Sequence, residues 1–366
     1  MVSINNQSFV SFKNRDITFV IINLSIYRIF SRFMLLYPKN SGSGAALSAV
    51  FSGLWAFLII SIIIFLFSKF KKGNILDAAE LSFGNFGKTI VASIILFYTA
   101  LSALVALGEF SHLAKLIAFP TAPLFYILIF FTVAGVFGAL GHLYSLLKLH
   151  SSFMPLILFA LILLTLSTIV RGDFSNLLPV LGKGSVSVFG KGLGGMIMYS
   201  DILLILLISP SDLDNIKTIK SFLKSTVIGI IFVCLFVFAL NVSIPYTISS
   251  ESSSPLYLLL KQVYYGRFFQ RIDAIILFAS AISGMLYLSF NAFIFSGVLA
   301  NTFNIKSPRR LTFLYFSFLF IAAVFIKLIP AKIITSLVFV LGFSLVFVFL
   351  ITLIFTSRRS ADNEKA

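Results

Sequence analysis

Apolar runs of about 20 residues recur along the whole chain and are separated by short polar stretches. A run of that length crosses roughly 30 Å of hydrocarbon as an α-helix. Outer-membrane strands would instead show about ten residues of strict apolar and polar alternation, which these runs lack. The pattern predicts an all-α integral membrane protein with ten transmembrane helices, at residues 17–38, 45–68, 89–118, 124–147, 153–170, 186–209, 222–245, 271–300, 311–329 and 333–356.

Polar residues interrupt two of these runs. Arg28 and Arg32 lie inside the first, and the sixth begins with "GKGLGGMIMYSD", which places Asp201 near mid-depth. These runs are the first spans of two groups of five, and paired broken helices in corresponding positions indicate a midplane binding site between inverted repeats. We predict one transmembrane domain over residues 1–366 with a 5+5 inverted repeat and broken first and sixth helices. The expected parts are a first repeat at about 17–170, a second at about 186–356 and a cytoplasmic tail at 357–366.

Composition agrees with a membrane protein, since 59% of the residues are hydrophobic and 11% are charged. Soluble domains carry roughly 25% charged residues. The net charge of +16 comes from basic residues scattered over short loops, so membrane lipids rather than nucleic acid are the expected partners. Lys and Arg are more frequent in the loops on the side of the N-terminus, and this bias predicts that both termini face the cytoplasm.

Enzyme and metal motifs give no support to a catalytic function. The segment "GKGLGG" at 190–195 matches the dinucleotide-binding pattern, but no soluble strand precedes it. His112, His142 and His150 lack the spacing of metal ligands, and the single cysteine, Cys234, excludes an internal disulfide. We therefore expect no enzymatic activity, no cofactor and no metal site.

The two arginines of the first span need an explanation, because a charged side chain at the bilayer centre costs at least about 2.5 kcal/mol unless it is paired or hydrated. On a continuous helix, Arg28 and Arg32 would share a face and repel each other. Asp201 is the expected counter-charge of Arg28, and a ligand carboxylate would compete for Arg28 while its ammonium is drawn to Asp201. The candidate ligand-binding residues are Arg28, Ser31, Ser102, Tyr199, Ser200, Asp201 and Ser283. Glu109 in the third span is either a proton or cation site or a hydrogen-bonded structural carboxylate.

Three longer segments resemble a known family. They are "LGEFSHLAKLIAFPTAPLFYI" at 107–127, "FSNLLPVLGKG" at 174–184 and "SPLYLLLKQVYYGRFFQRIDAIILF" at 254–278. Together with "FGNFGK" at 83–88 and Pro155, their order and spacing are similar to the B-subunit family of spore germinant receptors, the GerAB-like spore permeases. The resemblance implies a ten-helix protein of the amino acid, polyamine and organocation transporter superfamily in the inner membrane of a spore. It also implies A-type and C-type partner subunits and a small nutrient ligand, often an amino acid.

Two functions remain open at this stage. In the first, the chain is a B-type receptor subunit that binds a nutrient at a midplane site and signals germination. In the second, it is a proton- or sodium-coupled amino acid permease, because fold alone does not choose function. The first span departs from the family's pattern, since "YRIFSR" at 27–32 stands where small residues are usual, and this leaves the identity of the nutrient open.

Overall fold

The computed structural model describes residues 14–70, 73–208, 216–252, 254–262, 272–305, 307–325 and 331–363. Within these ranges the chain is helical and contains no strand. Eight helical segments of the described residues are long and apolar enough to cross a membrane, and α5 is a shorter apolar helix. The all-α multi-pass prediction is therefore confirmed.

The first half of the chain contains a broken helix followed by four further spans. Its elements are α1 (Asn14–Ile26), η2 (Tyr27–Phe30), η3 (Arg32–Leu35), α2 (Leu36–Ser41), η4 (Gly42–Gly44), α3 (Ala45–Ser68), α4 (Ile75–Ile117), α5 (Leu124–Leu140) and α6 (Leu143–Arg171).

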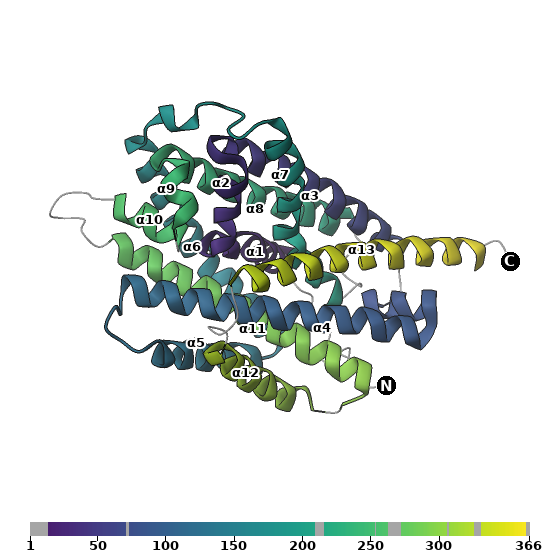
Figure 1. Cartoon of the computed structure of the whole chain (residues 1–366). Helices are drawn as coiled ribbons and strands as arrows, with labels where there is room; N and C mark the ends of the chain where they lie inside the picture. Colours follow the sequence, from purple (N-terminus) through teal and green to yellow (C-terminus); the bar gives the residue numbers. More distant parts are fainter. Residues whose placement is uncertain are drawn as a thin grey trace.

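The second half repeats this order, with short helices between its spans. Its elements are η5 (Phe174–Leu177), η6 (Val186–Gly190), α7 (Lys191–Gly194), η7 (Gly195–Leu207), α8 (Ile216–Ser243), α9 (Tyr246–Glu251), α10 (Pro255–Gln262), α11 (Ile272–Phe303), α12 (Pro308–Phe325) and α13 (Ala331–Asn363). Helix α4 packs against both α11 and α13, and Figure 1 shows these three helices side by side along the length of the bundle.

The first span breaks at Ser31, whose backbone is extended, with φ −107° and ψ 163°. The Ser31 hydroxyl donates to the carbonyl of Arg28 at 2.8 Å and accepts from the amide of Phe33 at 3.3 Å. Backbone groups that lose their helical partners inside a bilayer must find others, and serine side chains can supply them. The Ser31 side chain thus supplies a hydrogen-bond partner on each side of the break.

The sixth span departs from α-helical geometry over most of its described length. A π-helical turn at Val186–Gly190 and one α-helical turn precede η7, a 3-10 helix of 13 residues. Runs of 3-10 helix longer than three or four residues are uncommon, and inside a span they mark strain or a hinge. Together with the break at Ser31, this geometry confirms that the first and sixth helices are interrupted.

Several predicted boundaries were wrong, because hydropathy does not detect a turn inside an apolar segment. Helix α4 begins at Ile75 rather than 89, with Asn74 as its cap, and it bends at Gly84, whose φ is 70°. The boundary between the fourth and fifth spans lies at residues 141 and 142, both extended, rather than at 147–153. The basic residues Lys220 and Lys224, just before the predicted seventh span at 222–245 or at its start, belong to the first turns of α8, which begins at Ile216.

Glycines bring α5 close to α11. A Cβ at Gly138 would lie 2.9 Å from Cβ of Ser289 and would also strike its hydroxyl, which donates to the carbonyl of Gly135 at 3.1 Å. Small residues at such contacts allow helix backbones to approach closely in membranes. The close contact between α5, the fourth span, and α11 therefore requires glycine, which has no side chain, at Gly138.

We expect Gly138→Leu to lower the amount of folded protein in membranes several-fold, because an added side chain in a packed contact typically costs about 1–3 kcal/mol. The measurement is size-exclusion chromatography of solubilised membranes that contain a fluorescently tagged chain. Gly108→Leu is the matched control, since a Cβ at Gly108 meets nothing within 4 Å. Normal abundance of the Gly138 variant would contradict the close packing.

Candidate ligand site

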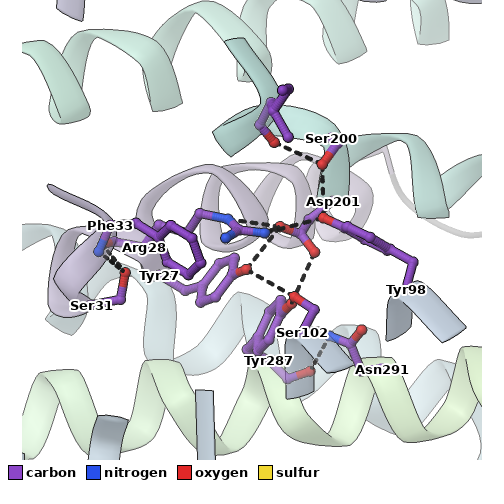
Figure 2. Close-up of polar contacts among 11 residues, drawn as sticks. Tyr27, Arg28, Ser31, Phe33, Tyr98, Ser102, Ser200, Asp201, Tyr287 and Asn291 are labelled. Carbon is purple, nitrogen blue, oxygen red and sulfur yellow. Dashed lines mark hydrogen bonds and ion pairs between the residues drawn. The ribbon is translucent and has the colours of Figure 1, made fainter. Parts of the chain in front are cut away.

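Four spans contribute polar side chains to one buried cluster near the break in the first span. Figure 2 shows how these side chains point toward one another. They come from the first span, α4, η7 and α11, and they are Tyr27, Arg28, Tyr98, Ser102, Ser200, Asp201 and Tyr287. We call this set the central network.

The carboxylate of Asp201 receives four hydrogen bonds. Nη2 and Nε of Arg28 donate to Oδ2 at 2.6 and 3.0 Å, and the hydroxyl of Tyr27 donates to the same oxygen at 2.8 Å. The hydroxyl of Tyr287 donates to Oδ1 at 2.8 Å. The ion pair between Arg28 and Asp201 that the sequence predicts is therefore present in the structure.

Both members of the ion pair are buried, with side-chain exposures of 2% for Arg28 and 0% for Asp201. Removing two charges from water is costly unless they are paired and their remaining donors and acceptors are satisfied. Here Nη2 of Arg28 also donates to the hydroxyl of Tyr98 at 3.1 Å. The guanidinium carbon lies 4.7 Å from the ring centroid of Phe33, which adds a cation–π contact. The pair contributes no net charge, which lowers the cost of burying it inside a membrane-spanning bundle.

Hydroxyl groups extend the central network between spans. Tyr98 and Ser200 are joined at 2.7 Å, and Ser200 donates to the carbonyl of Ile197. Ser102 contacts the hydroxyl of Tyr287 at 2.5 Å. The rings of Tyr27 and Tyr287 stack with their centroids 3.5 Å apart. A change at the ion pair would therefore alter hydrogen bonds made by side chains of α4, η7 and α11.

Of the predicted site residues, the structure brings together Arg28, Ser102, Ser200 and Asp201. Ser31 lies at the adjacent break, where its hydroxyl serves the backbone. Ser283 on α11 stands apart from the central network: its hydroxyl donates to Oδ1 of Asn23 at 2.7 Å, and Asn23 donates back to its carbonyl at 3.4 Å.

Tyr199 does not join the central network. Its hydroxyl is buried and has no hydrogen-bond partner among the described residues, and it lies near Tyr37 and Cys234 instead. At about 120° per residue on a 3-10 helix, Tyr199, Ser200 and Asp201 point in three different directions, and the direction of Tyr199 is the one that leads to Tyr37 and Cys234.

Sequence reasoning missed the tyrosines Tyr27, Tyr98 and Tyr287. Two of the three carry a signal in the sequence: Tyr27 precedes Arg28 directly, and Tyr98 lies four residues before Ser102, on the same face of α4. Asn23, the partner of Ser283, was also missed. A single polar residue in an apolar run does not show which way its side chain points.

Arg32 does not share a face with Arg28, so the predicted repulsion between them is wrong. The extended Ser31 lies between them and starts a new helical segment. The amide of Arg32 donates to Oε2 of Glu109 at 3.1 Å, which makes Glu109 a partner of the segment's first backbone N–H. A structural role for Glu109 has direct support, and a proton or cation role stays a prediction.

The described residues contain no group of three or more His, Cys, Asp or Glu side chains that could hold a metal ion. The chemistry available in the central network is that of one cation, one carboxylate and several hydroxyls, joined by a continuous chain of hydrogen bonds. Such an arrangement recognises a ligand through charge and hydrogen bonds rather than through covalent steps.

Comparisons with known proteins agree with this architecture. The structure resembles that of a Na⁺-coupled sialic acid symporter in a substrate-bound, outward-open state, with a TM-score of 0.67 and 13% identity, over 94% of this chain and 79% of the symporter. It also resembles MhsT in complex with L-phenylalanine, with a TM-score of 0.69 and 13% identity, over 93% of this chain and 87% of MhsT. At this identity the likeness shows the fold, that of transporters with inverted repeats. No curated protein sequence matches the chain. Residues 39–330 match the family model described as spore germination protein, the spore permeases.

Proposed function

Because the chain belongs to the spore germination protein family, we propose that it is the B-type subunit of a germinant receptor in the inner membrane of the spore. A small nutrient, an amino acid, binds between the first and sixth spans, and A-type and C-type subunits receive the resulting change. The observation that carries this proposal is the buried ion pair of Arg28 and Asp201 at the helix break.

An amino acid matches the charges of the ion pair. Its carboxylate can accept two hydrogen bonds from the planar guanidinium of Arg28, and its ammonium can donate to Asp201 and to the phenol oxygens of Tyr27 and Tyr287. Arg28 then pairs with the ligand carboxylate in place of Asp201, and Asp201 pairs with the ligand ammonium in place of Arg28. The net charge of the site stays at zero. A ligand with a single charge would leave either Arg28 or Asp201 buried and unpaired, which is strongly unfavourable.

Ligand binding at this place would separate the first span from the sixth. Arg28 lies on η2 and Asp201 on η7, and their contact is a direct link between the two interrupted helices. A ligand shifts a conformational equilibrium by the difference in its affinity for the two states. A ligand that inserts into the pair therefore favours the state in which the two spans are apart, and this state would be the signal to the partner subunits.

The alternative is a proton- or sodium-coupled amino acid permease. The likeness to a Na⁺-coupled symporter supports it at the level of fold. The two functions differ in an observable way, because a permease moves its substrate across a membrane without partner subunits.

We expect amino acids to trigger germination of spores that carry this chain, whereas analogues with an amidated carboxylate or without the ammonium group do not. Proteoliposomes containing the purified chain alone should show no gradient-driven uptake of the triggering amino acid. Protein-free liposomes give the baseline for uptake. Uptake driven by a sodium or proton gradient would show the permease, and germination by single-charge analogues would contradict the paired-charge site.

A further inference from the structure

A groove runs along the outside of the bundle between α3 and α8, two helices that pack against each other (Figure 1). On α3 its lining extends from Ala46 to Phe57, and on α8 it extends from Val227 to Phe238. Within each stretch, lining residues recur at the helical spacing i, i+4, i+7 and i+11, so one stripe of each helix forms a wall. We call this the α3–α8 groove; none of its lining residues belongs to the central network.

The two helices close the floor of the groove, and a loop closes one end. A Cβ at Gly53 would strike the side chain of Ile230, so α3 and α8 touch there. Leu177 of η5 lines the groove as well. The side-chain amide of Asn176 donates to the carbonyl of Val242 at 3.0 Å, four residues past the last lining residue of α8, which fixes η5 at this end. With a volume of about 790 Å³, the groove is a surface feature and not a packing defect.

The groove lies within one leaflet of the bilayer. Its α3 wall covers 11 helical steps of about 1.5 Å, or about 16 Å, which matches the roughly 15 Å of hydrocarbon in one leaflet. Near the floor, the hydroxyl of Ser52 donates to the carbonyl of Gly192 at the start of the sixth span. From Gly195 to Asp201 the 3-10 helix alone rises about 12 Å. The floor is therefore displaced from the central network by at least that distance, toward η5.

The lining is almost entirely hydrocarbon. Among the described residues that line the groove, none is charged, and only Ser43 and Cys234 have a polar atom in the side chain. The Ser43 hydroxyl already donates to the carbonyl of Pro179 at 2.7 Å. A polar ligand loses its hydrogen bonds to water when it enters such a place and finds few in return. The groove therefore suits an apolar molecule.

The groove is continuous with a surface that faces lipid. The α3 stripe continues past it with Leu58, Ile62 and Phe65, all exposed on a membrane-spanning helix. A groove left empty at this depth forfeits dispersion contacts along its walls. Lipid acyl chains are present at the same depth, are about as long as one leaflet is thick, and are flexible enough to follow the two walls.

A transmembrane helix of another subunit fits the groove less well. Helix contacts in membranes favour small residues that let the backbones approach. The exposed lining residues of the two walls are instead large, and they include Val50, Leu54, Ile231 and Leu235. Gly53 is already in contact with α8. A helix that crosses both leaflets would also meet η5 at the end of the groove, whereas an acyl chain can bend around it.

We infer that the α3–α8 groove is a lipid site that holds one acyl chain of a membrane phospholipid, in the leaflet on the side of η5. Under the topology expected from the loop charges, this is the outer leaflet. The chain packs on both α3 and α8 and so supports the contact of α3 with the sixth span at Ser52. The inference depends on the membrane-spanning fold and not on the identity of the nutrient.

The experiment uses the full-length protein in nanodiscs of palmitoyl-oleoyl phosphatidylglycerol. A trace of the same lipid carries a diazirine midway along one acyl chain, and irradiation crosslinks it to neighbouring residues, which peptide mass spectrometry identifies. We expect several-fold more crosslinks at 46–57 and 227–238 than on α12. The exposed residues Leu314, Phe318 and Ile321 of α12 report ordinary boundary lipid.

Two substitutions fill the groove from its two walls. Val50→Trp acts from α3 and Leu235→Trp from α8, at lining residues that are 44% and 41% exposed. In both variants, crosslinking in the groove should fall to the level of α12, because the indole occupies the space of the acyl chain. Val133→Trp is the matched control, since Val133 on α5 is 47% exposed and lies outside the groove. It should leave groove crosslinking unchanged. Size-exclusion chromatography selects the folded fraction of each variant.

Three outcomes would overturn the inference. The first is crosslinking in the groove no more frequent than on α12, which would show boundary lipid only. The second is an excess of groove crosslinks that survives both tryptophan variants. The third uses Val50→p-benzoylphenylalanine in native membranes: a protein adduct in place of a lipid adduct would show a helix of a second copy or of a companion subunit in the groove. None of these outcomes depends on nutrient binding, so the proposed function is tested separately.

Discussion

Replacing Asp201 by alanine is expected to cause a large fall in membrane abundance and to abolish the nutrient response. The variant leaves Arg28 buried among aromatic rings without a counter-charge, and breaking a buried pair in this way costs about 3–5 kcal/mol. This is a large part of the roughly 5–15 kcal/mol that stabilises a typical protein. Arg28→Ala should destabilise less, because Asp201 keeps its hydrogen bonds from Tyr27 and Tyr287. Immunoblots of membranes and melting curves of the purified chain measure both effects.

The exposed pair of Lys88 and Glu80, with 2.8 Å between its charged atoms, offers a matched control. An exposed pair contributes about 0–1 kcal/mol, so Glu80→Ala should leave abundance and response near the wild-type level. The double variant Arg28→Asp with Asp201→Arg restores a neutral pair and should recover abundance better than either single reversal. Wild-type melting and response in Asp201→Ala would show that the ion pair serves neither stability nor signalling.

Deleting the gene for the A-type subunit is expected to deplete this chain several-fold in spore membranes. Under the proposed function, the bundle presents part of its outward surface to companion subunits rather than to lipid. A chain whose stable form is the complex loses that stabilisation when the partner is absent. Quantitative immunoblots of spore membranes, normalised to an unrelated inner-membrane protein, measure the change. Unchanged abundance would favour a transporter that acts alone.

Hydropathy was sufficient to predict the helical architecture and the two interrupted spans, because the bilayer allows few alternatives for an apolar chain. The same constraint predicted the partner of Arg28: a charge at mid-depth requires compensation, and Asp201 was the acidic residue at a matching depth. The direction in which a side chain points from its helix could not be predicted from hydropathy. The spacing of Tyr98 and Ser102 places them on one face of α4, but the sequence does not show that this face meets the first span. Nothing in "MYSDI" at 198–202 indicates a 3-10 helix.

Turn positions inside apolar segments were also beyond prediction. The chain stays apolar on both sides of residues 141 and 142, so the boundary between α5 and α6 leaves no trace in hydropathy. The interruption of the first span was predicted from its polar residues, whereas the extended backbone at Ser31 was not. Its effect on Arg32, which turns that residue away from Arg28 and toward Glu109, follows from backbone angles that composition does not specify.

The 13 residues of η7 have a mechanical consequence. A 3-10 helix rises about 2.0 Å per residue and an α-helix about 1.5 Å, so η7 is about 6 Å longer than an α-helix of the same residues. The two geometries also turn by about 120° and 100° per residue, a difference that adds up to about 120° over the six residues from Gly195 to Asp201. If η7 rewound as an α-helix, it would both shorten and swing Asp201 away from Arg28. Under the proposed function, opening the ion pair would therefore free η7 to shorten and to rotate in one step.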